Sequence, residues 1–245
     1  MDRRSFLKQA SAYALATTWT MTNLEQIFAA TPPAKRNETR EPGKSMEHRN
    51  LGGMEVSAIG LGCLPMVGYY GGKYDKKEVL HWGLSEASAR SIRRAHSVCP
   101  LSAVQSEYAI WWREPETKIF STLQELGIGF VPYCPLGRAF LTGIINENSR
   151  FQKGDRRYNL PQFQPEALKH NMPLVYLVEE WAKHKGVTHA QFALIWMLSR
   201  KPWIVPIPGT TNPDHLDDFL GAASVRLTPY EMEEFDDAYA RIDLI

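Results

Sequence analysis

A chain of 245 residues is long enough for one sizeable core and for a single (β/α)8 barrel of roughly 250 residues, with no room to spare. The formal charge of +1 gives no electrostatic reason to expect a nucleic-acid partner, and 44% hydrophobic with 11% aromatic residues excludes a disordered chain. The three cysteines (Cys63, Cys99 and Cys134) are isolated, and no two histidines have an H-x-x-x-H spacing. Neither a disulfide framework nor a metal site is therefore expected.

The first thirty residues have the pattern of an export signal. Arg3-Arg4 opens a twin-arginine sequence, and the modestly apolar run from Ala10 to Met21 follows it. That run is too short and too rich in Ser and Thr for a stable membrane span, and an ordinary amphipathic helix is the alternative. Residues 31–45 are rich in proline, glycine and charge and are interpreted as a linker. We therefore expect a signal over 1–30, a folded domain over 46–245, and export to the periplasm or cell envelope.

The folded part begins with a hairpin and a buried strand. Gly52-Gly53 between alternating flanks predicts a β-hairpin over residues 48–57. The strand predicted over residues 58–63 contains a G-x-G sequence, which raises the alternative of a Rossmann phosphate loop. No third glycine, helix start or acidic ribose partner follows it, so close passage of the backbone is the better explanation.

Strands and helices alternate through the rest of the chain. Periodicity predicts strands over residues 79–85, 103–108, 128–133 and 203–208. A helix capped by Ser85 or Ser88 is expected to run through Val98, and further helices are expected over 117–126, 173–185 and 188–200. Thr188 and Gln191 form a capping box for the helix at 188–200, and two more helices open at Asn212-Pro213 and at Thr228-Pro229 with Glu231. Residues 137–172 have few periodic apolar positions and are interpreted as a lid or binding loop. With the strand at 58–63, this pattern predicts about five parallel core strands in βαβ units.

Six short motifs then resemble the aldo-keto reductases in order and spacing, from about Glu47 to the C-terminus. They are Arg49-Asn-Leu-Gly52, Gly60-Leu-Gly-Cys63, Gly83-Leu-Ser-Glu86, Gln105-Ser-Glu-Tyr108, Tyr133-Cys-Pro-Leu-Gly137 and Ile207-Pro-Gly-Thr210. The resemblance implies a TIM-type barrel and an oxidoreductase that acts on carbonyl or alcohol substrates with NADP(H), NAD(H) being the alternative cofactor.

The same resemblance assigns a cofactor role to ten residues. Ser85 and Gln105 would bind the nicotinamide carboxamide, and Tyr133 would stack on the ring; Cys134, Leu136 and Arg138 would lie along the pyrophosphate, and Gly209, Thr210, His215 and Asp218 on the adenosine side. Two positions depart from the family pattern, because relatives usually carry Arg at position 215 and Asn at Phe219. Since His is a weak phosphate partner near neutral pH, the choice between NADP and NAD stays open.

The larger departure lies between Glu78 and Val79. Family members run through a helix and three further strands before the one containing Ser85, so roughly 100 residues are missing if each βα unit takes about thirty. The family's catalytic Asp, Tyr, Lys and His lie in that stretch, and no residue of this sequence matches them. Tyr69, Tyr70 or Tyr74 with Lys76 or Lys77 is an alternative acid pair without supporting structure. His81 is an alternative base, expected instead to pack within its strand.

These observations predict an incomplete (β/α)8 barrel with an N-terminal hairpin and open sheet edges that favour self-association. The expected function is an aldo-keto reductase-type oxidoreductase that is inactive in this chain, with a small carbonyl or alcohol as its substrate if active. The alternatives are a non-catalytic nucleotide-binding or self-associating module and a deletion product without a stable function.

Overall fold

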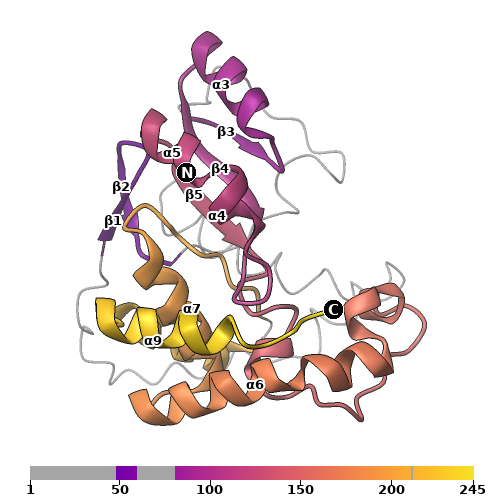
Figure 1. The fold of residues 1–245 in the computed structure, drawn as a ribbon. Helices are drawn as coiled ribbons and strands as arrows, with labels where there is room; N and C mark the ends of the chain where they lie inside the picture. Colours follow the sequence, from indigo (N-terminus) through magenta and orange to yellow (C-terminus); the bar gives the residue numbers. More distant parts are fainter. Residues whose placement is uncertain (1–47, 60–80, 211) are drawn as a thin grey trace, which may run out of the picture. The chain divides into compact units, whose positions relative to one another are not determined.

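The computed structural model describes residues 48–59 and 81–245 apart from residue 211 (Figure 1), and these residues belong to one compact unit. The predicted signal, the linker, most of the strand predicted at 58–63 and the Tyr69 to Lys77 alternative lie outside the described residues. Of that strand, Ala58 and Ile59 are described, and both are buried. Across the described part of the chain, no helix combines the length and the hydrophobicity that crossing a membrane requires.

The predicted hairpin is confirmed as β1 (His48–Leu51) paired antiparallel with β2 (Met54–Ser57). Its turn needs glycine, because Gly52 and Gly53 have φ angles of +57° and +85°. Arg49 anchors the hairpin to the rest of the domain by donating hydrogen bonds to the carbonyls of Leu198, Lys201 and Ile204. A Cβ at Gly52 would lie 1.8 Å from the carbonyl oxygen of Ser102, so the hairpin also packs tightly on the sheet.

Within the described residues the main sheet is parallel, in the order β3 (Trp82–Ser85), β4 (Leu101–Glu107) and β5 (Gly129–Tyr133). Residues 203–207 continue it beside β5: Val205 N–H donates to Phe130 O at 2.9 Å, and Ile207 N–H donates to Pro132 O at 3.1 Å. The strand predicted at 203–208 is wrong as a regular strand. Pro132 has no N–H to donate across to this segment, so the ladder keeps one complete bridge.

The helices follow the predicted caps, with two corrections. They are α3 (Ala89–Val98), α4 (Glu114–Lys118), α5 (Phe120–Leu126), α6 (Pro165–Lys185), α7 (His189–Arg200), α8 (Pro213–Gly221) and α9 (Pro229–Tyr239). The helix predicted at 117–126 is divided into α4 and α5 at Ile119, whose φ of −133° is not helical. The helix predicted to start at Pro173 starts one proline earlier, at Pro165, and carries Pro173 inside it. The predicted loop therefore ends at Gln164.

That shorter loop is not structureless. It contains the 3-10 turns η3 (Phe140–Thr142), η4 (Arg156–Asn159) and η5 (Pro161–Phe163), and a further 3-10 turn, η6 (Ala222–Ser224), follows α8. Phe140 and Phe163 are buried, and Trp111 contacts both rings, with centroids 4.7 and 5.5 Å away. These aromatic contacts attach the loop to the core beside the ends of β4 and β5.

A four-residue ionic network joins α4, α7 and α9. The Glu116 carboxylate accepts hydrogen bonds from Tyr108 (2.6 Å), Arg113 (2.9 Å) and Arg200 (3.0 Å). Asp236 accepts from the same two arginines, at 2.9 and 2.5 Å. Two positive and two negative charges therefore balance in a partly buried site, and breaking one pair there leaves an uncompensated charge.

Candidate functional site

The carboxyl ends of the parallel strands bring the predicted nicotinamide residues to one edge of the sheet. Ser85 on β3 is the register partner of Gln105 on β4, and Tyr133 ends β5 opposite Glu107. Ser85 is exposed, while Gln105 and Tyr133 are half-buried. Within the described residues the side chains of Ser85 and Gln105 make no hydrogen bond, so their polar groups remain available to a ligand. We call this edge the strand-end rim.

Two carboxylates that the sequence reasoning missed complete the rim. Glu86 directly follows Ser85, and its Oε1 accepts a hydrogen bond from the Glu107 N–H at 2.8 Å. The backbone N–H of Glu86 donates to Gln105 O at 2.9 Å, so the end of β3 is tied twice to β4. Glu86 lies one position after Ser85, and Glu107 lies two positions after Gln105, both within the family-like motifs. The presence of a glutamate at the end of each of these two predicted strands was the signal that could have found them.

Tyr133 is a neutral phenol in this environment. Burial raises its pKa, and the neighbouring Glu86 and Glu107 carboxylates raise it further. A tyrosine acts as a general acid when a nearby cation lowers its pKa, whereas the surroundings of Tyr133 raise its pKa. The ring can offer a flat surface to a ligand, but the phenol is a poor proton donor.

Arg138 is held at the rim by Glu107 in a two-pronged ion pair. Its Nη2 donates to Glu107 Oε2 at 2.8 Å, and Nη1 contacts Oε1 as well. The side chains are 14% and 16% exposed, and the hydrogen bond raises the pKa of Arg138. Sequence could not show this pair, because 31 positions separate its members. The guanidinium predicted to meet a pyrophosphate is thus occupied by a carboxylate in this structure.

The backbone around the rim is unusual. In the described part of the chain, the non-glycine residues with positive φ are Glu86 (51°), Cys134 (52°), Arg138 (53°) and Ala139 (75°). All four follow β3 or β5, at the carboxyl ends of the sheet. Non-glycine residues in this left-handed region are uncommon and tend to cluster at functional sites. Burial raises the pKa of the Cys134 thiol, so this cysteine is not an activated nucleophile.

The four residues predicted for the adenosine side lie between residue 209 and the middle of α8. The Thr210 hydroxyl accepts from the Asn212 N–H at 3.0 Å and lies 3.3 Å from His215 Nδ1. Gly209 is exposed, with open space where a side chain would be. Asp218 is already engaged, because its carboxylate accepts from the Thr188 hydroxyl at 2.8 Å, at the start of α7. Phe219 is a core residue.

The remaining candidates do not add a catalytic group to the rim. The prediction that His81 packs within its strand is wrong: it precedes β3, is exposed, and lies with Nδ1 3.1 Å from Ser102 Oγ. The Tyr108 hydroxyl donates to Glu116 in the ionic network, and burial raises its pKa. Among the described residues no three His, Cys, Asp or Glu side chains are placed to hold a metal ion. Leu136 is buried.

Comparisons with known proteins agree on one family. A sequence model described as the aldo/keto reductase family matches residues 74–240. The chain is 41% identical over 165 residues to a protein of Glycine max named probable aldo-keto reductase 1, covering 67% of this chain and 47% of that relative. The solved glycerol dehydrogenase of Gluconobacter oxydans aligns with a TM-score of 0.64 at 25% identity, over 68% of this chain and 50% of that one. The chain thus spans about half the length of these relatives. It belongs to the aldo/keto reductase family and has that family's TIM-barrel-like α/β fold.

Proposed function

We propose that this chain binds NADP(H) at the strand-end rim and does not turn over carbonyl substrates by itself. The observation that carries the proposal is the pairing of Ser85 with Gln105 on adjacent strands, both with available side chains, beside the flat ring of Tyr133. An amide and a hydroxyl at strand ends suit the nicotinamide carboxamide, and a neutral aromatic ring suits a flat heterocycle. Bound NADP(H) would supply hydride at this position.

The fit is better on the nicotinamide side than along the phosphates. Thr210 and His215 lie together at the N-terminus of α8, and the N-terminus of a helix favours a bound anion. Arg138, however, is paired with Glu107, and Asp218 with Thr188. We infer that dinucleotide affinity is modest and that His215, where relatives usually carry Arg, weakens the preference for NADP over NAD.

The absence of turnover follows from proton chemistry. Reducing a carbonyl requires hydride and a proton for the forming alkoxide, and positioned acid catalysis contributes about 10²–10⁴-fold. Tyr133 has a raised pKa and carboxylate neighbours, so it does not replace a tyrosine activated by a cation. We propose that the segment carrying the family's Asp, Tyr, Lys and His is missing between Glu78 and Val79 and that the barrel is incomplete. A match to about half of each relative supports this. Sequencing the gene across these two codons tests whether the join is native.

Self-association is a second candidate function, and the position of β3 at an edge of the described sheet supports it. In the described part of the chain β3 pairs with β4 on one side, and Trp82 is 47% exposed. An edge strand of this kind favours pairing with another chain. Sedimentation at several protein concentrations tests this candidate. A monomer at every concentration would contradict it.

We also propose that residues 1–30 direct export by the twin-arginine route to the periplasm or cell envelope. Replacing Arg3 and Arg4 by Lys should leave the protein in the cytoplasm, whereas an unchanged distribution between cell fractions would contradict the proposal.

The binding proposal is tested by NADPH titration of the full chain, with the fluorescence of its seven tryptophans as the signal. We expect saturable quenching that Tyr133→Ala weakens roughly fivefold to a hundredfold, the usual range for losing a stacked ring. Tyr176→Ala is the matched control, because this tyrosine is exposed on α6. Absence of quenching together with aggregation would instead support a deletion product without function.

A further inference from the structure

A cavity of about 510 Å³ lies at the loop between η3 and α6. Its volume falls within the roughly 300–1,000 Å³ of typical small-molecule sites. Within the described part of the chain, its lining residues come from one continuous stretch, residues 150–165, and none of the ten residues assigned to the dinucleotide is among them. Inferences about this cavity therefore do not rest on the proposed function.

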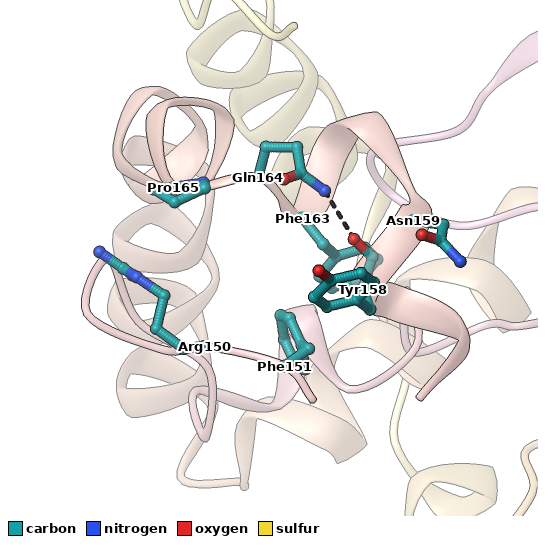
Figure 2. Close-up of a pocket in the computed structure, with 7 residues that line it drawn as sticks. All are labelled: Arg150, Phe151, Tyr158, Asn159, Phe163, Gln164 and Pro165. Carbon is teal, nitrogen blue, oxygen red and sulfur yellow. Dashed lines mark hydrogen bonds between the residues drawn. The ribbon is translucent and has the colours of Figure 1, made fainter. Parts of the chain in front are cut away.

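The floor of the cavity is aromatic and held in place. Phe163 is 3% exposed and makes edge contacts with Phe151 and Trp111, at centroid distances of 5.4 and 5.5 Å. The Arg157 guanidinium covers the Phe151 ring at 4.5 Å and is itself neutralised by Asp155. Figure 2 shows the rings of Phe151 and Tyr158 on one side of the cavity, with Arg150 and Pro165 on the other.

The charge in the lining comes from Arg150. This guanidinium donates through Nη1 to the carbonyls of Glu147 and Ser149, and among the described residues it forms no ion pair. Among the described residues, no acidic side chain lines the cavity. The Tyr158 hydroxyl and the Asn159 amide, both exposed, also make no side-chain hydrogen bond in the described part of the chain. The cavity therefore combines aromatic surface, one available cation and two neutral polar groups.

We propose that this cavity binds a planar aromatic carboxylate. The rings of Phe151, Tyr158 and Phe163 would receive the flat apolar part, because aromatic groups pack in edge and offset arrangements. Arg150 would hold the carboxylate, since the planar guanidinium pairs with a carboxylate through parallel hydrogen bonds. A neutral compound of the same shape would lose this second interaction.

The test uses naphthalene-2-carboxylate as the probe and isothermal titration calorimetry on the full chain. We expect saturable binding that 2-naphthol, the neutral analogue, reproduces at least tenfold more weakly. Arg150→Gln should weaken the carboxylate at least tenfold and leave 2-naphthol unchanged. Tyr158→Leu should weaken both compounds. Arg94→Gln, at an exposed arginine on α3, is the matched control and should leave both unchanged.

Several results would overturn the proposal. They are the absence of saturable binding at millimolar probe, equal loss of affinity in Arg150→Gln and Arg94→Gln, and equal affinity for the carboxylate and 2-naphthol. Displacement of the probe by NADPH would place it at the rim and would also contradict a separate cavity. Because Arg150 is exposed, its variant should keep the wild-type circular dichroism spectrum and decides the question even if Tyr158→Leu does not fold.

Discussion

Replacing Glu107 by glutamine is expected to tighten the binding of NADPH. In the wild-type chain the Glu107 carboxylate occupies both arms of the Arg138 guanidinium, and Glu86 adds a further negative charge at the rim. If the rim binds a dinucleotide as proposed, these carboxylates would repel the phosphates that Arg138 would otherwise attract. Glutamine keeps the size of the side chain and removes one negative charge.

The expected size follows from the burial of the pair. Two unit charges 4 Å apart interact by about 1 kcal/mol in water and about 4 kcal/mol at an effective dielectric constant of about 20. The two side chains are 14% and 16% exposed, but a bound dinucleotide would lie at the surface of the rim, so a value near the lower limit applies. A gain of about 1–2 kcal/mol corresponds to roughly five- to thirtyfold tighter binding.

Calorimetric titration with NADPH at low and high salt measures this effect, which should shrink as salt screens the exposed phosphates. Glu114→Gln is the control, because that carboxylate pairs with Lys118 at 2.7 Å on the exposed face of α4. An affinity for NADPH that stays equal or falls in Glu107→Gln, with cooperative unfolding preserved, would refute the assignment of Arg138 to the phosphates.

Three further predictions concern stability. Glu116→Gln should lower the free energy of unfolding in urea by about 2–4 kcal/mol, because it removes the negative charge that two arginines share and puts an amide N–H2 donor in place of one acceptor oxygen; a loss below about 0.5 kcal/mol would contradict this reading of the network. Gly52→Ala should prevent the hairpin from docking, since its Cβ would lie 1.8 Å from Ser102 O, and proteolysis of the hairpin should accelerate; unchanged proteolysis would be inconsistent with that contact. The hydrogen bond from Lys185 lowers the pKa of Glu231 from 4.5 to about 2, so its stabilising contribution is complete above about pH 4.5 and is lost as the pH falls through about 2. Urea titrations at several pH values should show the free energy of unfolding falling between about pH 4.5 and 2 in the wild-type chain, and this fall should be smaller in Glu231→Gln. The same pH dependence in both proteins would argue against the ion pair.

Local sequence signals predicted the helix ends well where residues close in sequence form the cap. Thr188 with Gln191 and Thr228 with Glu231 form the predicted capping boxes, because each box needs residues three positions apart. Gly127 and Gly186 end α5 and α6 in the left-handed conformation.

Helix and strand boundaries were predicted wrongly where contacts between residues far apart in sequence determine them. A sequence pattern could not show that Ile119 leaves the helical region or that Pro132 interrupts pairing with residues 203–207. The start of α6 was misplaced because Pro165 and Pro173 are both suitable first residues of a helix.

In the candidate site, the positions of residues at strand ends were predictable, and the contacts formed by loop residues were not. Alignment of Ser85 with Gln105 and placement of Tyr133 at the same edge follow from parallel strand ends, which periodicity locates. Pairing of Arg138 with Glu107 depends on a loop conformation with positive φ at Arg138, and residue spacing does not encode it.

The most direct measurement of the central claim combines binding with hydride tracing. The full chain is incubated with an aromatic aldehyde and NADPH carrying deuterium at the transferred position, and the alcohol is analysed by mass spectrometry. We predict saturable binding of NADPH and no deuterated alcohol above a protein-free control. Deuterated alcohol formed in proportion to the protein would contradict the absence of turnover, and failure to bind NADPH would contradict the rim as a dinucleotide site.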